Sequence, residues 1–317
     1  MTLNQLRSFL AVAESGSVRA AAEELVVTQA AVSASIAALQ KSLGVALVTP
    51  DGRGLRLTDA GASYARYARR ILGLLDEAGR AAAAAADPER GELRLAAVTT
   101  AAEQIVPGIL GGFRQQHPHT GVRLEAGNRD RVRSLLDRHQ VDLVLTGRPE
   151  PGWDVVVHGV RPHELVVVAA PDLAAAAQAG NGERATAGAD APGLLPWLAR
   201  QTWLLREPGS GTRASTDTLL ADLDLTPLTL MVASNVAIRE SAQVGLGVTL
   251  LSRDAVAAEL AVRKLTELPV PGTPLHRDWY LAARPGPLPP PAARLVAHAL
   301  RTGGFRSPDT ADQTPSD

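Results

Sequence analysis

The sequence contains no cysteine among its 317 residues. Disulfides, thiolate metal sites and cysteine nucleophiles are therefore excluded. No apolar run approaches the roughly twenty residues that a membrane-spanning helix needs, and the N-terminus lacks the basic region and apolar core of an export signal. With 45% hydrophobic residues, the chain is expected to be a soluble, cytoplasmic protein that is long enough for two or three domains.

The chain also has little excess charge of either sign, with a formal net charge of -1. Phosphate neutralisation supplies most of the affinity of proteins for DNA. Residues 1–58 contain five basic and four acidic side chains. The basic ones are Arg7, Arg19, Lys41, Arg53 and Arg56, and the acidic ones are Glu14, Glu23, Glu24 and Asp51. One copy of this segment should bind DNA weakly, and pairing several copies on one site would raise the effective affinity.

A helical pair is predicted in the first sixty residues. Ser17 and Thr28 are suitable N-caps, because a hydroxyl accepts from a free amide of the first helical turn. After Thr28, apolar residues recur on one helical face at Val32, Ile36, Leu39 and Leu43. The short turn between the helices is typical of a helix-turn-helix.

The opposite face of the second helix is small and smooth, so it can enter a major groove. Gln pairs with adenine, Ser with several bases, and Ala methyls contact thymine. Asp51-Gly52 predicts a hairpin behind the helix, with arginines that contact phosphate. The predicted DNA-binding residues are Thr28, Gln29, Ala30, Ser33, Ala34, Ser35, Arg53 and Arg56. Periodicity alone also fits a small helical domain that binds nothing.

The segment NQLRSFLAVAESGSVRAAAEELVVTQAAVSASIAALQKSLGVALVTPDGRGLRLTDAG resembles the N-terminal signature of the LysR-type transcriptional regulators. This resemblance implies a winged helix-turn-helix over residues 1–58. Residues 59–88 then predict a long helix with a seam at Tyr64, Ala68, Ile71, Leu75, Ala78 and Ala82, spaced alternately four and three. In the family this segment is the dimer's linker helix, although the same pattern fits an amphipathic helix packed on its own domain.

From Gly91 onward, strand and helix patterns alternate, which predicts an α/β fold with a mainly parallel sheet. Strands are expected at DVVVHGV and ELVVVAA, an irregular surface insertion at 174–192, and a second crossing at DWYLAAR. Two crossing strands would join two lobes around a cleft. The expected boundaries are 91–161 plus 269–301 for lobe I, 162–268 for lobe II, and 302–317 for a disordered tail.

This half resembles the two-lobed, periplasmic-binding-protein-like effector domain of the same family. LLREPGSGTR and ASNVAIRESAQVGLGVTLLS resemble the subgroup that includes regulators of carbon-fixation operons and some regulators of sulfur or nitrogen assimilation. The resemblance implies a regulator that forms dimers and tetramers.

The loop Pro208–Arg213 follows a strand and opens a helix. Its glycines let backbone N–H groups converge, and the helix end and Arg213 add positive charge, so an anion is expected there. Thr99 and Thr100 follow a strand on the other lobe, where open α/β sheets bind ligands. The predicted effector-binding residues are Thr99, Thr100, Asn128, Gly147, Arg148, Ser210, Gly211, Thr212, Arg213 and Asn235. The loop also fits a simple turn, Asn235 a helix cap, and Arg148 a solvated charge.

Together these patterns predict a DNA-binding regulator that responds to a small anionic metabolite such as a phosphorylated sugar, phosphate, sulfate or carboxylate. Its partners would be promoter DNA and further copies of the chain. No cofactor, metal site or enzyme activity is expected, because Ser210 lacks the G-x-S-x-G context and the histidines lack ligand spacing. Two alternatives are a solute-binding module whose N-terminal helices only oligomerise, and a hydrolase or transferase on the two-lobed domain.

Overall fold

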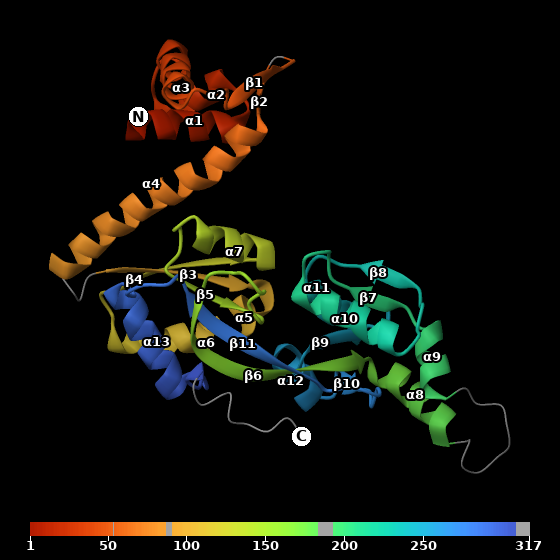
Figure 1. Cartoon of the computed structure of the whole chain (residues 1–317). Helices are drawn as coiled ribbons and strands as arrows, with labels where there is room; N and C mark the ends of the chain where they lie inside the picture. The colour runs from red at the N-terminus through yellow and green to blue at the C-terminus, as the bar shows by residue number, and fades with distance from the viewer. Residues whose placement is uncertain (53, 87–90, 183–192, 309–317) are drawn as a thin grey trace. The chain divides into compact units, whose positions relative to one another are not determined.

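A computed structural model describes residues 1–52, 54–86, 91–182 and 193–308. The contacts between residues divide the chain into two compact units. The first comprises Met1–Gly91 with Asp137–Val141, and the second comprises Glu92–Leu136 with Asp142–Asp317. Figure 1 labels the helices and strands of both units.

The first unit consists of three helices, a hairpin and a long fourth helix. Its elements are α1 Leu3–Ser15, α2 Val18–Leu25, α3 Gln29–Leu43, β1 Val48–Asp51, β2 Gly54–Leu57 and α4 Asp59–Ala86. Strand β1 pairs with β2 antiparallel, as the Asp51-Gly52 pair predicts. The axes of α2 and α3 are bent by 108°, which agrees with the predicted helix-turn-helix.

Hydroxyl caps fix where the helices of this unit begin. The Ser17 hydroxyl accepts from the amide of Ala20 at 3.4 Å, and the Thr28 hydroxyl from the amide of Ala31 at 3.2 Å. Gly16 and Gly44 end α1 and α3 in the left-handed conformation, which glycine adopts without steric cost. Both predicted N-caps are therefore confirmed.

The core of the first unit lies where the apolar periodicity places it, with one exception. Val32, Ile36 and Leu39 are buried against α1 and α2 residues such as Phe9. The expectation for Leu43 is wrong, because this last residue of α3 lies beyond the packed core and is 37% exposed.

Helix α4 begins where predicted, with the Thr58 hydroxyl accepting from the amide of Gly61 at 2.9 Å. Its expected apolar seam, however, is divided between two environments. Ala68 is fully buried in the core of its own unit. The exposed apolar side chains of α4 form a shifted stripe, made of Tyr67, Ile71, Leu74 and Leu75. The first turns of the seam thus pack into the core of the unit, and the stripe remains exposed.

Among the described residues, no single helix is long and apolar enough to cross a membrane. Only the bent pair α2 and α3 meets that criterion of length and composition together.

The second unit is a three-layered α/β structure of two lobes. Its elements are β3 Glu92–Val98, α5 Thr99–Gln104, α6 Val106–Gln116, β4 Gly121–Gly127, α7 Arg129–Asp137, β5 Leu143–Thr146, β6 Val156–Ala169, α8 Pro171–Gly182, α9 Leu194–Arg200, β7 Trp203–Leu205, α10 Gly211–Asp222, β8 Thr229–Met231, α11 Asn235–Gln243, β9 Thr249–Ser252, α12 Arg253–Ala261, β10 Thr266–Glu267, β11 Leu275–Ala283 and α13 Pro290–Thr302.

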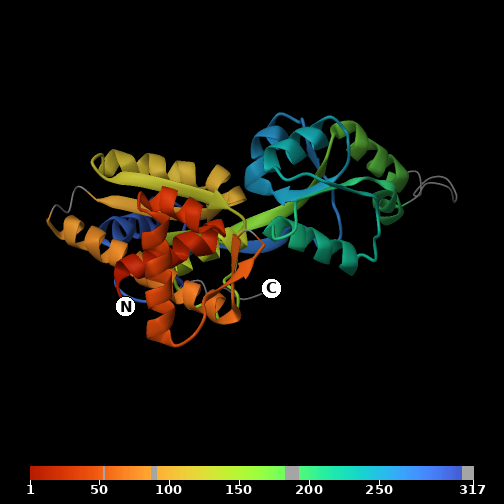
Figure 2. The ribbon, with the colours of Figure 1, turned by 90° about the horizontal axis from the view of Figure 1, so that it is seen from above.

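The sheet is mixed, so the expectation of a mainly parallel sheet is wrong. Strand β3 pairs parallel with β4 and β5, whereas β11 pairs antiparallel with β5 and β6, and β6 antiparallel with β9 and β10. The antiparallel pairs arise because β6 leaves lobe I and β11 returns beside it. Figures 1 and 2 both show these two strands running side by side from one lobe to the other.

Strand β6 is continuous from Val156 to Ala169, although the sequence predicts two separate strands there. Pro162 lies at the crossing, where it faces Asp278 of β11. Strands β9 and β10 pair with β6 only from Leu165 onward. One side of β6 is therefore unpaired at Pro162, and such a position tolerates a residue without an N–H.

Two other expectations differ from the structure. The insertion expected over 174–192 begins inside a helix, α8, and 183–192 lie outside the described residues. The tail expected to be disordered from 302 is folded at its start, because Phe305 is buried in the core and Arg306 bridges to Val160. Residues 309–317 lie outside the described part of the chain.

Each lobe has a hydrophobic core of its own. The core of lobe I includes Leu93, Phe113 and Trp279. In lobe II, two cores lie on opposite sides of β6, one around Trp203 and one around Ile238. Val270 and Leu275 still pack with lobe II, so the chain returns to lobe I after Leu275, later than the predicted boundary at residue 269.

Candidate functional site

A cavity of about 420 Å³ lies between the two lobes of the second unit. Eight of the ten predicted effector-binding residues line it: Thr99, Thr100, Asn128, Gly147, Arg148, Ser210, Gly211 and Thr212. Residues from loops far apart in the sequence thus meet around one space of a size that suits a small molecule.

The lobe I wall is built at the carboxyl ends of three neighbouring strands. Thr99 follows β3, Asn128 follows β4 and Gly147 follows β5. These strands are parallel and adjacent, so their ends lie together at one edge of the sheet. Asn128 also accepts a hydrogen bond from the amide of Arg131 at 2.9 Å, which fixes the start of α7 at this edge.

The lobe II wall is the N-terminus of α10. Ser210 is the N-cap, and Gly209 turns the chain at a φ of +86°. A Cβ on Gly211 would lie 3.6 Å from the Arg129 guanidinium, which belongs to lobe I. The positive end of a helix and a full positive charge therefore lie side by side on the cavity lining, an arrangement that suits an anion.

Several cavity residues are absent from the sequence prediction. Arg129, His163, Arg206, Arg277 and Tyr280 all line it. Arg129 directly follows Asn128 and could have been found from the same strand-to-helix turn. Arg277 and Tyr280 lie on β11, whose register against β6 cannot be read from the sequence. With Arg148, the cavity has four arginines against the two carboxylates of Asp222 and Asp278.

Arg213 does not line this cavity, although its motif predicts a contact with the anion. Its Nε lies 2.8 Å from Oδ1 of Asp217, and its Nη1 donates to the carbonyl of Arg206 at 3.2 Å. It lines a neighbouring cavity of about 310 Å³. A carboxylate one helical turn away neutralises Arg213, and the i, i+4 spacing explains that contact.

Asn235 does not line the main cavity either, and it is not the cap of α11. Ser234 is the cap, and its hydroxyl accepts from the amide of Ala237 at 3.3 Å. The Asn235 amide donates to Oγ1 of Thr100 and to Oε2 of Glu103, each at 3.1 Å. Asn235 therefore bridges from lobe II to lobe I.

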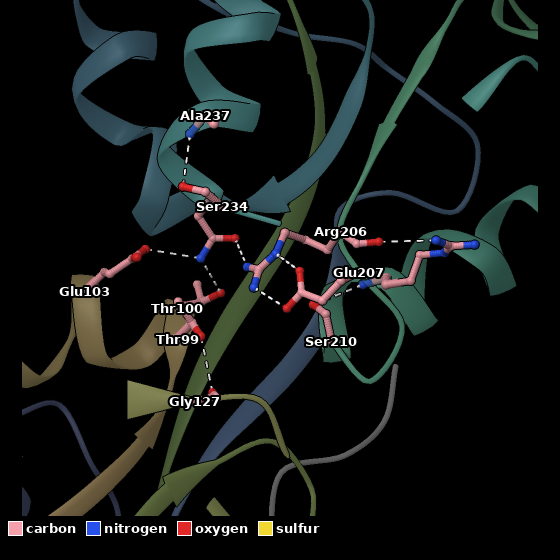
Figure 3. A network of polar contacts seen from close by, with 11 residues as sticks. Thr99, Thr100, Glu103, Gly127, Arg206, Glu207, Ser210, Ser234 and Ala237 are labelled. Atoms are coloured by element: carbon pink, nitrogen blue, oxygen red, sulfur yellow. Dashed lines mark hydrogen bonds and ion pairs between the residues drawn. The ribbon is translucent and has the colours of Figure 1, made fainter. Parts of the chain in front are cut away.

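Arg206 is the buried centre of this network, with only 4% of its surface exposed. Its Nε and Nη2 donate to the two carboxylate oxygens of Glu207, each at 2.8 Å, and its Nη1 donates to Oδ1 of Asn235. Figure 3 shows this pair beside Thr99, Thr100 and Glu103. The hydrogen bond from Arg206 lowers the pKa of Glu207, so Glu207 stays ionised and balances the charge of Arg206.

His163 also lines the cavity. Its ring stacks on Trp279, with centroids 4.1 Å apart and planes at 10°. Burial lowers the pKa of His163 to about 4, with further lowering by the positive charges of Arg277 and Arg161. At neutral pH the ring is therefore uncharged.

The outer face of α3 is open to solvent, as predicted. Thr28, Gln29, Ala30, Ser33 and Ala34 are exposed, and Ser35 is half-buried. Arg56 is exposed on β2, whereas Arg53 lies outside the described residues. The exposed side chains are small except for Gln29, which leaves a smooth helical surface beside the hairpin.

Within the described ranges, no group of three His, Cys, Asp or Glu side chains could hold a metal ion. The charged groups of the cavity are instead mainly cationic. A helix-turn-helix unit joined to a two-lobed unit with a cationic interlobe cavity defines a ligand-responsive, DNA-binding regulator.

Two family models match the chain. Residues 3–62 match the bacterial regulatory helix-turn-helix protein of the lysR family, and residues 86–304 match the LysR substrate binding domain. The chain therefore belongs to the LysR family of transcriptional regulators. These proteins are regulators and not enzymes, and they bind promoter DNA, oligomerise and bind small-molecule effectors.

Relatives of the chain agree with the carbon-fixation subgroup. The HTH-type transcriptional regulator CfxR of Cupriavidus necator is 35% identical over 89% of this chain and 85% of its own length. The RuBisCO operon transcriptional regulator of Allochromatium vinosum is 35% identical over 92% of this chain and 93% of its own. The structure of the Synechocystis CcmR regulatory domain in complex with 2-PG matches 71% of this chain and 99% of its own, with 26% identity and a TM-score of 0.54.

Proposed function

We propose that the interlobe cavity binds a small anionic metabolite and that its occupancy changes how the helix-turn-helix units engage promoter DNA. The observation that carries the proposal is the position of Arg129 beside the N-terminus of α10, at Gly211. The ligand class would be a phosphorylated sugar, phosphate, sulfate or carboxylate, bound without covalent attachment. No further cofactor is needed for this role.

The balance of charge around the cavity supports an anion over a neutral ligand. Arg206 is compensated by Glu207. Among the described residues, Arg129 forms only a loose ion pair, with Glu150 at 3.6 Å. A ligand anion bound beside Arg129 and the amides that follow Ser210 would gain charge-assisted hydrogen bonds from both lobes. Such a ligand stabilises one interlobe arrangement over others by its difference in affinity for them.

The similarity to the CcmR regulatory domain suggests which candidate effectors to test first. That regulatory domain was solved with 2-PG, and a related ligand in this chain would be an anion of similar size. Because the Allochromatium vinosum relative is named for the RuBisCO operon, carbon-fixation genes are the first targets to examine. As a regulator that acts on promoter DNA, the chain would work in the cytoplasm.

On the DNA side, Gln29 and Ser33 would contact bases, and Arg56 a phosphate. The stripe of Tyr67, Ile71, Leu74 and Leu75 on α4 would pair two copies of the chain. Two such dimers would form a tetramer on a pseudo-palindromic site. Pairing matters because the helix-turn-helix unit has nearly balanced charge and binds weakly by itself.

A thermal-shift screen of phosphorylated sugars, 2-PG, phosphate, sulfate and organic acids tests the ligand assignment. At least one anion should raise the melting temperature, whereas neutral sugars should not. The absence of a shift with every anion at millimolar concentration would contradict the proposal.

Binding of the chain to the DNA upstream of its own gene tests the proposed role in DNA binding. Gln29→Ala and Ser33→Arg should weaken specific binding and leave the melting temperature unchanged. Equal loss on random-sequence DNA would show that these side chains do not read bases. A chain that fails to bind its upstream DNA at low salt would favour a solute-binding module instead.

A further inference from the structure

The bridge between Asn235 and Thr100 joins the two lobes beside the cavity. Asn235 is 5% exposed and begins α11 of lobe II, whereas Thr100 and Glu103 lie on α5 of lobe I. The single amide nitrogen of Asn235 donates to both, each at 3.1 Å. Both amide protons are thereby used.

The orientation of the Asn235 side chain is fixed by Arg206. A guanidinium carries only donors, so the oxygen of Asn235 must face it, and the nitrogen must face lobe I. Arg206 cannot turn away easily, because it is 4% exposed and held by both oxygens of Glu207 at 2.8 Å. The assignment of oxygen and nitrogen thus follows from chemistry.

This orientation has a consequence for the hydroxyl of Thr100. A hydroxyl has one proton and two lone pairs. Since Asn235 donates to Oγ1, the proton of Thr100 must point elsewhere, and Thr100 lines the cavity. Within the described residues the Thr100 hydroxyl has no acceptor. Its neighbour Thr99 differs, because its hydroxyl already donates to the carbonyl of Gly127 at 3.2 Å.

We propose that Asn235 is a positioning residue for the effector site: it makes Thr100 a donor directed into the cavity, ready for an anionic oxygen. The role rests on the proposed function of the cavity. Asn235 acts through Thr100 and does not contact the ligand. This indirect role explains why Asn235 belongs to the site although it does not line the cavity. The buried pair of Arg206 and Glu207 fixes the orientation of Asn235.

The test separates this role from a simple link between the lobes. Asn235→Asp removes both donated bonds and places a carboxylate against Glu103. Adding Glu103→Gln restores one link, since the new amide can donate to the new carboxylate, and it leaves the net charge at its original value. In this double variant the Thr100 hydroxyl donates to that carboxylate, so its proton turns away from the cavity. Glu103→Gln alone keeps an acceptor for Asn235 and serves as the control.

Inorganic phosphate is the probe, with urea unfolding and the phosphate-induced thermal shift measured on the full chain. The double variant should recover most of the stability lost in Asn235→Asp, while its phosphate affinity stays about tenfold or more below wild type, the effect of one charge-assisted hydrogen bond. Thr100→Val should cause a similar loss in the wild-type background and little further loss in the double variant.

Recovery of phosphate affinity together with stability would overturn the positioning role and leave Asn235 as a structural link. Equal phosphate affinity in Asn235→Asp and wild type would also overturn it. A wild-type chain that neither phosphate nor any other anion of the screen stabilises, under conditions where the Glu103→Gln control folds normally, would instead contradict the proposed function on which the role rests.

Discussion

Glu207 holds Arg206 through both carboxylate oxygens, at 2.8 Å each, and these two residues are adjacent in the chain. Arg206 lines the cavity, so its charge is present at the site but is balanced internally. The cavity therefore offers an incoming anion less positive potential than its number of arginines suggests.

Replacing Glu207 by Gln should strengthen anion binding and weaken the fold. Loss of the carboxylate leaves the positive charge of Arg206 uncompensated, which should raise phosphate affinity by roughly fivefold for each ~1 kcal/mol of added attraction. The same change should lower the free energy of unfolding by about 1–3 kcal/mol, since Arg206 is buried. Titration calorimetry and urea unfolding measure the two effects.

Glu240→Gln is the matched control for this change. It removes one negative charge from the same lobe, at a side chain that is 60% exposed and only loosely paired with Arg239. Both quantities should stay close to wild type. A decrease in phosphate affinity for Glu207→Gln would show that Arg206 does not contribute to the potential in the cavity.

The stability of the chain should fall in mild acid through His163. Its pKa is about 4 in the folded chain, against an ordinary value of 6.5. Between pH 6.5 and pH 4, His163 is protonated in the unfolded chain but remains neutral in the folded chain. The contribution of neutral His163 to stability is therefore complete above pH 6.5 and is lost as the pH falls toward 4. His163→Gln should flatten that part of the pH profile. An imidazole NMR titration with a midpoint near 6.5 would contradict the account.

Two glycines of α4 should respond in opposite ways to alanine. A Cβ on Gly61 would lie 1.9 Å from the carbonyl oxygen of Leu47, whereas a Cβ on Gly79 would meet nothing within 4 Å. Gly61→Ala should destabilise the first unit by about 2 kcal/mol or more, because backbone must move. Gly79→Ala should stabilise it by about 0.5–1 kcal/mol through helix propensity. If both changes had similar effects on urea unfolding, the close packing of Gly61 against the backbone of Leu47 would be contradicted.

Val26 is a strained position in the turn between α2 and α3. It has a φ of +56° and is 89% exposed, so a β-branched residue adopts the left-handed region without gaining burial. Val26→Asn should raise the free energy of unfolding by about 1 kcal/mol, since Asn tolerates this conformation better. The control Val27→Asn, at a residue without positive φ, should bring no gain. A loss of stability with Val26→Asn would argue against strain.

Local signals in the sequence were sufficient for much of this fold. Hydroxyl caps and glycine stops act within one turn of helix, so Ser17, Thr28 and Gly16 could be placed from the sequence. Eight cavity residues could be found because strand ends and glycine-rich turns have local signatures. The same reasoning could not separate the core half of the α4 seam from its exposed half, since that depends on what packs against the helix.

The remaining site residues depend on contacts between distant segments. Arg277 reaches the cavity only because of the register of β11 on β6, and Asn235 bridges to Thr100 across 135 positions of sequence. For Arg213, in contrast, a local motif predicts a contact with a ligand anion, but in the structure the guanidinium contacts the carboxylate of Asp217.

Coupling between anion and DNA tests the central claim most directly. Promoter binding by fluorescence anisotropy should be compared with and without the stabilising anion, for wild type, Arg129→Gln and the control Arg123→Gln, whose side chain is 61% exposed. The anion should change the promoter affinity of wild type and of the control, and should have no effect on Arg129→Gln. Identical wild-type binding curves with and without the anion, at concentrations where the thermal shift is complete, would contradict the account.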